Sequence, residues 1–247
     1  MTSIRAYPRF FVSLESIQGG KVQFPPDIAH QIVRVLRLKP GDRVSALPND
    51  GRLLVVALER ASNGEASGVI EEDHWPATEL PYRVTVLQSL ISREKAELAI
   101  QGCAQAGAMR IVFVPTERSV VRWDQRKGAE RLRRWQAIAR EQAELSFRAR
   151  YPSVEYMGDI GTALENADGR RLLLHEGESI ERLGRLSLTE DLTLIIGPEG
   201  GFGEAETARI VALGAEAVSV GPRVLRTESA ALYVLGAVEG MMMEARR

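Results

Sequence analysis

Two glycine-containing loops near the C-terminus hold the residues with the clearest chemical potential. Residues 196–203 read IGPEGGFG and residues 221–228 read GPRVLRTE, and each loop follows an apolar run typical of a buried strand. Glycine lets a backbone approach a ligand closely and adopt positive φ. In an open α/β sheet, ligands bind outside the carboxyl ends of the strands, where such loops emerge. The pair therefore predicts a ligand site, although a single glycine-rich turn is as often purely structural.

The first loop does not have the features of a phosphate site. It lacks the Gly-Lys-Ser/Thr sequence of a phosphate-binding loop, and its spacing differs from the dinucleotide fingerprint. Glu199 inside the loop would repel a pyrophosphate and attract a cation. S-adenosylmethionine carries a sulfonium and an ammonium group, so an acidic glycine loop favours this cofactor over a nucleotide.

The elements that must position these loops change in character along the chain. Up to residue 73 we expect short strands and tight turns, with one amphipathic helix over 27–36 and a hairpin at Asn49-Asp50-Gly51. Residues 74–81 hold two prolines and no periodicity, which indicates a linker. From residue 82 onward, apolar strands alternate with helices, a pattern typical of a mostly parallel sheet covered on both faces. The helices are expected over 92–106, 126–148, 204–213 and 227–243, and the strands over 83–87, 110–114, 171–175, 192–196 and 217–220.

Charge is unevenly distributed, although the formal net charge is −1. Residues 110–151 hold eleven Lys/Arg and five Asp/Glu, whereas residues 152–247 hold nine and sixteen. Such a basic stripe suits contact with phosphates, but on charge alone a solvated helix surface is the more common explanation. Three histidines and the single cysteine, Cys103, lie far apart, so we expect no metal site and no intrachain disulfide. No signal peptide or membrane span is recognisable, which predicts a soluble, cytoplasmic protein.

The two loops and their flanks resemble the SPOUT methyltransferases and, more narrowly, the 16S rRNA (uracil-N3)-methyltransferase family. The similar segments span nearly the whole chain: 9–12, 30–37, Gln88, 141–152, 194–202 and 220–230. The resemblance implies a PUA-like β-barrel domain for RNA binding over 1–73, a linker over 74–81 and a SPOUT methyltransferase domain over 82–247. That second domain would combine a parallel sheet with a C-terminal trefoil knot.

The resemblance also implies partners and site residues. S-adenosylmethionine would be the cofactor, 16S rRNA or the small ribosomal subunit the substrate, and a homodimer the assembly, without a metal or a membrane. The cofactor residues implied by the family motifs are Leu174, His175, Glu176, Ile196, Gly197, Glu199, Gly200, Gly201, Gly221, Leu225, Arg226, Ser229 and Ala230. Contacts with RNA are expected from Arg9, Arg34, Arg37 and Arg122.

Methylation at uracil N3 sets chemical demands of its own. N3 must lose its proton, which leaves negative charge shared with O2 and O4. Arg226, or alternatively Arg148, could stabilise that charge, although a structural ion pair is the competing interpretation for each arginine. Glu228 or Glu141 could accept the proton. The target base must be unpaired or flipped out, because N3 is buried in a Watson–Crick pair.

The chain departs from the family pattern in two places. Residues 104–107 read AQAG where the family has Thr-Glu-Leu-Gly, and residues 144–148 read ELSFR where it has Glu-Gln-Ser-Gly-Arg. Gln105 and Leu145 therefore leave the details of uridine recognition open. Two other functions are compatible with these motifs. One is a SPOUT enzyme that acts on a ribose 2′-hydroxyl or another base, and the other is a non-catalytic RNA-binding or ribosome-assembly protein.

Overall fold

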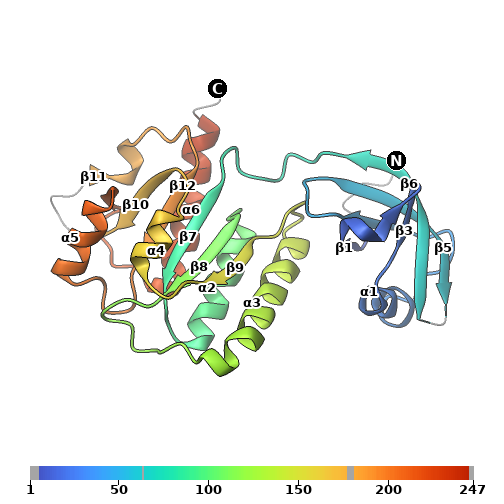
Figure 1. Ribbon diagram of the computed structural model, residues 1–247. Helices are drawn as coiled ribbons and strands as arrows, with labels where there is room; N and C mark the ends of the chain where they lie inside the picture. The colour runs from blue at the N-terminus through green and yellow to red at the C-terminus, as the bar shows by residue number, and fades with distance from the viewer. Residues whose placement is uncertain (1–5, 63, 177–180, 245–247) are drawn as a thin grey trace. The chain divides into compact units, whose positions relative to one another are not determined.

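The computed structural model describes residues 6–62, 64–176 and 181–244. The chain divides into two compact units, each built around its own sheet (Figure 1). Unit 1 comprises residues 1–79 together with 143–151, and unit 2 comprises residues 80–142 together with 152–247. Among the described residues, no helix has the length and apolar character that crossing a membrane requires.

Unit 1 contains a six-stranded sheet in the order β1-β4-β5-β6-β3-β2. Strand β1 pairs with β4 in parallel, and the other pairs are antiparallel. The predicted hairpin is confirmed between β4 and β5, where Asn49 and Gly51 both adopt positive φ. The strands are β1 (Arg9–Phe11), β2 (Ile17–Gln18), β3 (Lys21–Gln23), β4 (Arg43–Leu47), β5 (Leu53–Ser62) and β6 (Glu65–His74). A short 3-10 helix lies at Leu14–Ser16, and helix α1 (Pro26–His30) continues into a π-helical turn at Gln31–Val35.

Both faces of this sheet are covered, because neighbouring residues of β1 point to opposite sides. Phe10 belongs to a core that includes Ile28 of α1. Phe11 belongs to a second core that includes Ala143, and its ring meets that of Tyr151 edge to face at 4.7 Å. Residues 143–151 pack with unit 1 because Ala143 and Tyr151 help to cover this second apolar face of the sheet.

A buried ion pair fixes the same segment. The Arg148 side chain is only 2% exposed and donates to the Glu79 carboxylate from Nη2 at 2.6 Å and from Nε at 3.0 Å. Glu79 also accepts the backbone N–H groups of Ala149 at 3.1 Å and Arg150 at 3.2 Å. The segment 143–151 lies inside the domain expected over 82–247, so its membership of unit 1 differs from the division drawn on the sequence.

Unit 2 contains a seven-stranded sheet in the order β11-β13-β10-β12-β7-β8-β9, and every pair is parallel. Its strands are β7 (Val84–Ser89), β8 (Arg110–Val114), β9 (Ser153–Tyr156), β10 (Arg170–Leu174), β11 (Glu181–Arg182), β12 (Leu192–Ile196) and β13 (Ala215–Ser219). Its helices are α2 (Arg93–Gln105), α3 (Gln125–Leu145), α4 (Ile160–Glu165), α5 (Glu204–Ala212) and α6 (Thr227–Glu244), with a 3-10 turn at Leu183–Arg185.

Helices cover both faces of the parallel sheet (Figure 1). Leu194 of β12 packs in a cluster with Trp135 of α3 and Val234 of α6, and α2 joins the same cluster. The next residue, Ile195, points the other way and packs with Ile210 of α5 and with α4. This arrangement confirms the predicted fold class, a small curved β module and a parallel α/β sheet. The knot implied by the family remains a prediction.

Candidate functional site

A cavity of about 500 Å³ lies in unit 2, where the loops after β10, β12 and β13 meet. These strands are adjacent in the sheet and parallel, so their carboxyl ends share one edge. The lining residues are Lys95, Arg118, Leu174, His175, Glu176, Ile196, Gly197, Pro198, Glu199, Gly200, Gly201, Phe202, Ser219, Val220, Gly221, Arg223, Val224, Leu225, Arg226, Thr227, Glu228 and Ala230. Both glycine loops singled out in the sequence therefore reach one site.

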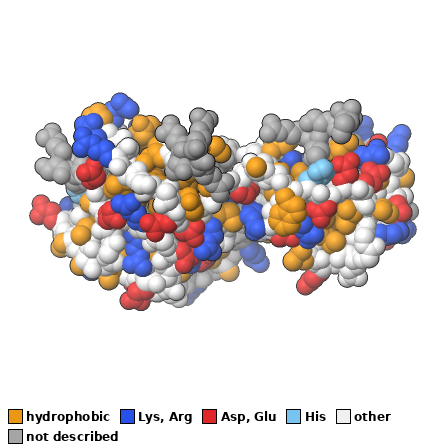
Figure 2. Space-filling view, turned by 90° about the horizontal axis from the view of Figure 1, so that it is seen from above, with side chains coloured by type: hydrophobic (Ala, Val, Ile, Leu, Met, Phe, Trp, Pro, Cys, Tyr) orange, Lys and Arg blue, Asp and Glu red, His pale blue; other side chains and the backbone are white. Residues whose placement is uncertain are grey.

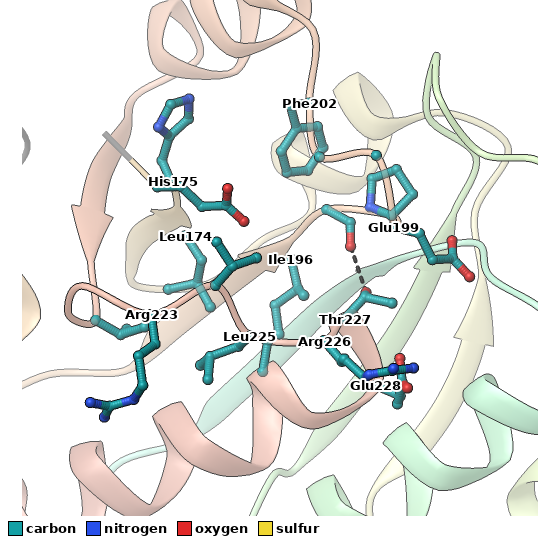
Figure 3. A pocket seen from close by; sticks show the side chains of 18 of the residues that line it. Leu174, His175, Ile196, Glu199, Phe202, Arg223, Leu225, Arg226, Thr227 and Glu228 are labelled. Carbon is teal, nitrogen blue, oxygen red and sulfur yellow. Dashed lines mark hydrogen bonds between the residues drawn. The ribbon is translucent and has the colours of Figure 1, made fainter. Parts of the chain in front are cut away.

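Part of the cavity wall is apolar. Leu174, Ile196 and Leu225 come from three different segments and lie side by side (Figure 3). Gly200 also lines this cavity, and a Cβ at this position would meet only the Arg118 side chain, in ordinary contact at 3.7 Å. A larger side chain at Gly200 would therefore occupy cavity space without disturbing the fold.

Hydrogen bonds tie the two loops together. The Thr227 hydroxyl, at the start of α6, donates to the Gly197 carbonyl at 2.6 Å, which is the dashed line in Figure 3. Gln88, at the end of β7, donates from Nε2 to the same hydroxyl at 2.9 Å. Gln88 is fully buried and Thr227 is 6% exposed, so water does not compete for these bonds. This hydrogen-bond relay from Gln88 through Thr227 to Gly197 fixes the position of the first loop relative to the start of α6.

The carboxylate of the first loop has a partner in the protein. Glu199 accepts a hydrogen bond from Lys95 of α2 at 2.7 Å. Partial burial acts to raise the pKa of Glu199, but the hydrogen bonds from Lys95 and from its own backbone N–H outweigh it, so the pKa lies below its usual value. Glu199 is therefore ionised and its charge is compensated. This differs from the expectation drawn from the sequence, in which the Glu199 carboxylate was available to a cationic ligand.

The structure brings nearly all the expected cofactor residues together. Each of them lines the cavity except Ser229, whose backbone N–H donates to the Arg226 carbonyl at 2.9 Å. The sequence did not predict nine further lining residues, which are Lys95, Arg118, Pro198, Phe202, Ser219, Val220, Arg223, Val224 and Thr227. Lys95 and Arg118 follow β7 and β8, so their nearness to the site depends on the order of strands in the sheet. Thr227 and Phe202 lie within or beside the glycine loops and could have been found there.

The candidate catalytic residues separate into two groups. Arg226 and Glu228 line the cavity, and Figure 3 draws both side chains beside the start of α6. Glu141 is exposed on α3 and is not among the lining residues. Arg148 lies in unit 1, where it pairs with Glu79. In the described part of the chain, no three His, Cys, Asp or Glu side chains are placed to hold a metal ion.

The candidate RNA contacts also differ from one another. Arg9 donates from Nη2 to the carbonyls of Phe147 at 3.2 Å and Arg148 at 3.3 Å, and it lies over the Phe147 ring, so it holds unit 1 together. Arg34, Arg37 and Arg122 are exposed. Basic and acidic side chains are interspersed on the face of each unit drawn in Figure 2, in keeping with the many surface ion pairs.

Comparison with known families gives a consistent result. Residues 78–239 match the family described as RNA methyltransferase domain. The chain is 33% identical over 238 residues to the ribosomal RNA small subunit methyltransferase E of Mycobacterium bovis, covering 93% of this chain and 90% of that protein. It is 31% identical over 243 residues to the protein of the same name from Bacillus subtilis, covering 93% of this chain and 95% of the relative.

Solved structures show the same similarity in three dimensions. A ribosomal RNA small subunit methyltransferase E from Neisseria gonorrhoeae, bound to S-adenosylmethionine, superimposes with a TM-score of 0.84 at 26% identity, covering 95% of this chain and 98% of the other. A Legionella pneumophila protein described as a methyltransferase, in complex with the same cofactor, gives a TM-score of 0.85 at 26% identity, covering 95% and 97%.

Proposed function

The chain belongs to the ribosomal RNA small subunit methyltransferase E family, and we propose from this membership that it methylates N3 of a uridine in 16S ribosomal RNA. It is an S-adenosylmethionine-dependent enzyme. The observation that carries the proposal is the cavity formed jointly by the two glycine loops at the carboxyl edge of a parallel sheet. This is where an open α/β sheet binds its ligand.

The residues of the cavity suit this cofactor. A volume of about 500 Å³ lies within the range for small-molecule sites, and the wall combines apolar side chains with glycine backbone. Gly200 lies where a side chain would take up ligand space. When bound, S-adenosylmethionine supplies an electrophilic methyl group on a sulfonium centre. The residues that would hold it are Leu174, His175, Glu176, Ile196, Gly197, Gly200, Gly201, Gly221, Leu225 and Ala230.

Two charged side chains would serve the methyl acceptor in this proposal. Arg226 lines the cavity, and no carboxylate lies within ion-pair distance of it among the described residues, so its charge is available to a uracil that loses its N3 proton. Glu228 lines the same cavity and is the first choice as proton acceptor. Glu141 and Arg148 remain alternatives with weaker support, because neither is a lining residue.

RNA is held, in this proposal, partly by unit 1. Arg34 lies in the last turn of the helical segment at Pro26–Val35 and Arg37 follows that segment, and both are exposed, as phosphate contacts must be. Arg122 is exposed on the loop between β8 and α3. The methylated base is unpaired or flipped out of its helix, because N3 is otherwise engaged in pairing.

The enzyme acts in the cytoplasm as a homodimer in this proposal, and the apolar surface of α2 and α6 supports the dimer. Leu98 of α2 is 54% exposed, and Leu232 and Tyr233 of α6 are each 45% exposed. Met243, near the end of α6, is 52% exposed as well, whereas Met242 is buried in the core. Light scattering at micromolar concentration should give twice the mass of 27.2 kDa. A monomer mass would contradict the dimer without touching the proposed reaction.

The reaction is tested by mass spectrometry of 16S rRNA nucleosides from cells with and without the gene. We expect 3-methyluridine to disappear on deletion and to return with the wild-type gene. Loss of a 2′-O-methyl nucleoside instead would assign the enzyme to a ribose target. An unchanged nucleoside profile together with measurable cofactor binding would favour a role in ribosome assembly.

A further inference from the structure

The turn that follows β8 is held rigidly beside the cavity. The Thr116 and Ser119 hydroxyls lie 2.8 Å apart, and the Ser119 backbone N–H donates to the Thr116 carbonyl at 3.0 Å. The backbone N–H of Glu117 donates to Oε1 of Glu206 on α5 at 3.1 Å. Since Glu206 is only 1% exposed, this contact anchors the turn to the body of unit 2.

Arg118 is the residue that this turn presents to the cavity. Its Nη1 donates to the Gly200 carbonyl at 2.8 Å, and the side chain is part of the cavity lining. A guanidinium has five N–H donors, so one bond leaves most of them available. The neighbouring carboxylates of Glu117 and Glu206 both lie 3.8 Å from Arg209. No carboxylate in the described ranges lies within 4.0 Å of the Arg118 guanidinium.

Lys95 provides an instructive contrast. It lines the same cavity from the first turn of α2, the helix that follows β7, but Glu199 neutralises it at 2.7 Å. Of these two cations, only Lys95 forms an ion pair, whereas Arg118 interacts with the Glu206 carboxylate through longer-range Coulombic attraction alone. It comes from the β7–β8 side of β12, whereas the loops after β10 and β13 lie on the other side. The cofactor has two cationic groups and one carboxylate, so its net charge is positive and an arginine disfavours it overall, whereas the RNA substrate is a polyanion with one phosphate per nucleotide.

We propose that Arg118 binds a phosphate of the substrate RNA next to the base that receives the methyl group. This inference rests on the proposed function and names the residue that seats the target nucleotide at the cavity. The Gly200 carbonyl orients the guanidinium. The Arg118 side chain would therefore contact the phosphate and the first glycine loop at the same time. Arginine suits this position because its planar fork can donate to a carbonyl and to a phosphate oxygen simultaneously.

The test compares Arg118→Ala and Arg118→Lys with the control Arg185→Ala, which removes the same charge from an exposed arginine of unit 2 outside the cavity. The probe is an unmethylated 16S rRNA transcript, bound at several salt concentrations. Arg118→Ala should weaken RNA binding about 10-fold and lower the slope of log affinity against log salt by about 1. Arg118→Lys should retain the slope, because it keeps the charge, and Arg185→Ala should behave as wild type.

Calorimetry measures the affinity of the Arg118 variants for S-adenosylmethionine and thereby separates a phosphate contact from a role in cofactor binding. Affinity within about twofold of wild type supports the phosphate contact. A loss of cofactor affinity with an unchanged salt slope would overturn it, because Arg118 would then only hold the Gly200 loop or the cofactor's own carboxylate. The salt slope is independent of methyl transfer. If Arg118→Ala lowers the salt slope but the wild-type enzyme methylates no uracil N3, the proposed function is wrong. The phosphate contact of Arg118 would still be supported.

Discussion

The Thr227 hydroxyl donates a hydrogen bond of 2.6 Å to the Gly197 carbonyl and thereby joins the two loops that form the cavity. It accepts a hydrogen bond from the buried Gln88 amide at the same time. One hydroxyl thus links the end of β7, the end of β12 and the start of α6. The contact is a property of the folded site, because 30 residues separate Thr227 from Gly197 in the sequence.

Removing this hydroxyl should weaken cofactor binding more than it weakens the fold. Thr227→Val keeps the side-chain shape but removes the donor to the Gly197 carbonyl and leaves the Gln88 amide with only its longer bond to the Ser89 carbonyl, at a cost of about 1–3 kcal/mol. We expect affinity for S-adenosylmethionine to fall about 10-fold by calorimetry, and Thr227→Ser to restore it. Thr193→Val is the control, because Thr193 is also buried and donates to a carbonyl, that of Asp168, outside the cavity. Equal losses of affinity in both valine variants would argue against a specific role for the relay.

Gly200→Val should abolish cofactor binding in a folded protein. A Cβ at Gly200 meets only ordinary contacts, and the two additional methyl groups of valine would take up space in the cavity. Calorimetry and circular dichroism would measure affinity and fold together. Gly158→Val is a suitable control, since nothing lies within 4 Å of a Cβ at Gly158 and this glycine is not part of the lining. Unchanged affinity in a folded Gly200→Val protein would show that the cofactor lies elsewhere.

Arg226→Ala should affect turnover rather than binding. If Arg226 stabilises the negative charge on the deprotonated uracil, its removal lowers the single-turnover rate by about 100-fold at saturating RNA and cofactor. Arg226→Lys should retain part of the rate, because a positive charge remains. A wild-type single-turnover rate in Arg226→Ala would show that another cation stabilises the negative charge on the uracil.

The exposed arginines of unit 1 should contribute to the salt dependence of RNA binding. Arg34→Ala with Arg37→Ala should lower the salt slope by about 2, one unit for each phosphate contact, without changing cofactor affinity. Arg60→Ala in the same unit is the control, because Arg60 is exposed but pairs with Glu65 at 2.9 Å. Arg9→Ala should instead destabilise unit 1, since Arg9 donates to two backbone carbonyls there. If the double variant has the salt slope of the wild type, the loop and helix around Arg122 become the better candidate for RNA binding.

Arg148 should prove structural. Replacing it with methionine leaves the Glu79 carboxylate without the partner that neutralises it, which should lower the free energy of unfolding by about 3 kcal/mol in a denaturant titration. Arg43→Met breaks an exposed pair with Glu71 and should have little effect. A stable but inactive Arg148→Met protein would instead support a catalytic role for this residue.

The sequence alone determined the elements whose signals are local. The short apolar runs at 192–196 and 110–114 predicted strands, and the structure has strands at both. The glycine loops were recognisable because backbone conformation and close approach depend on the residues themselves; Gly201 and Gly221 do adopt positive φ. Segments with weak periodicity escaped prediction, among them β9 (Ser153–Tyr156) and α4 (Ile160–Glu165). Their amphipathic pattern is too short to stand out.

Only the tertiary structure decided which side chains meet. Nothing near Glu199 in the sequence indicated that Lys95 would neutralise it, or that Arg118 would bond to the neighbouring glycine. Both contacts depend on the strand order β12-β7-β8, which brings the ends of three parallel strands to one edge. The return of residues 143–151 to unit 1 likewise depends on burying Phe11 and pairing Arg148 with Glu79. Local sequence fixes backbone conformation and burial, whereas long-range pairing of charges depends on the topology that brings distant segments together.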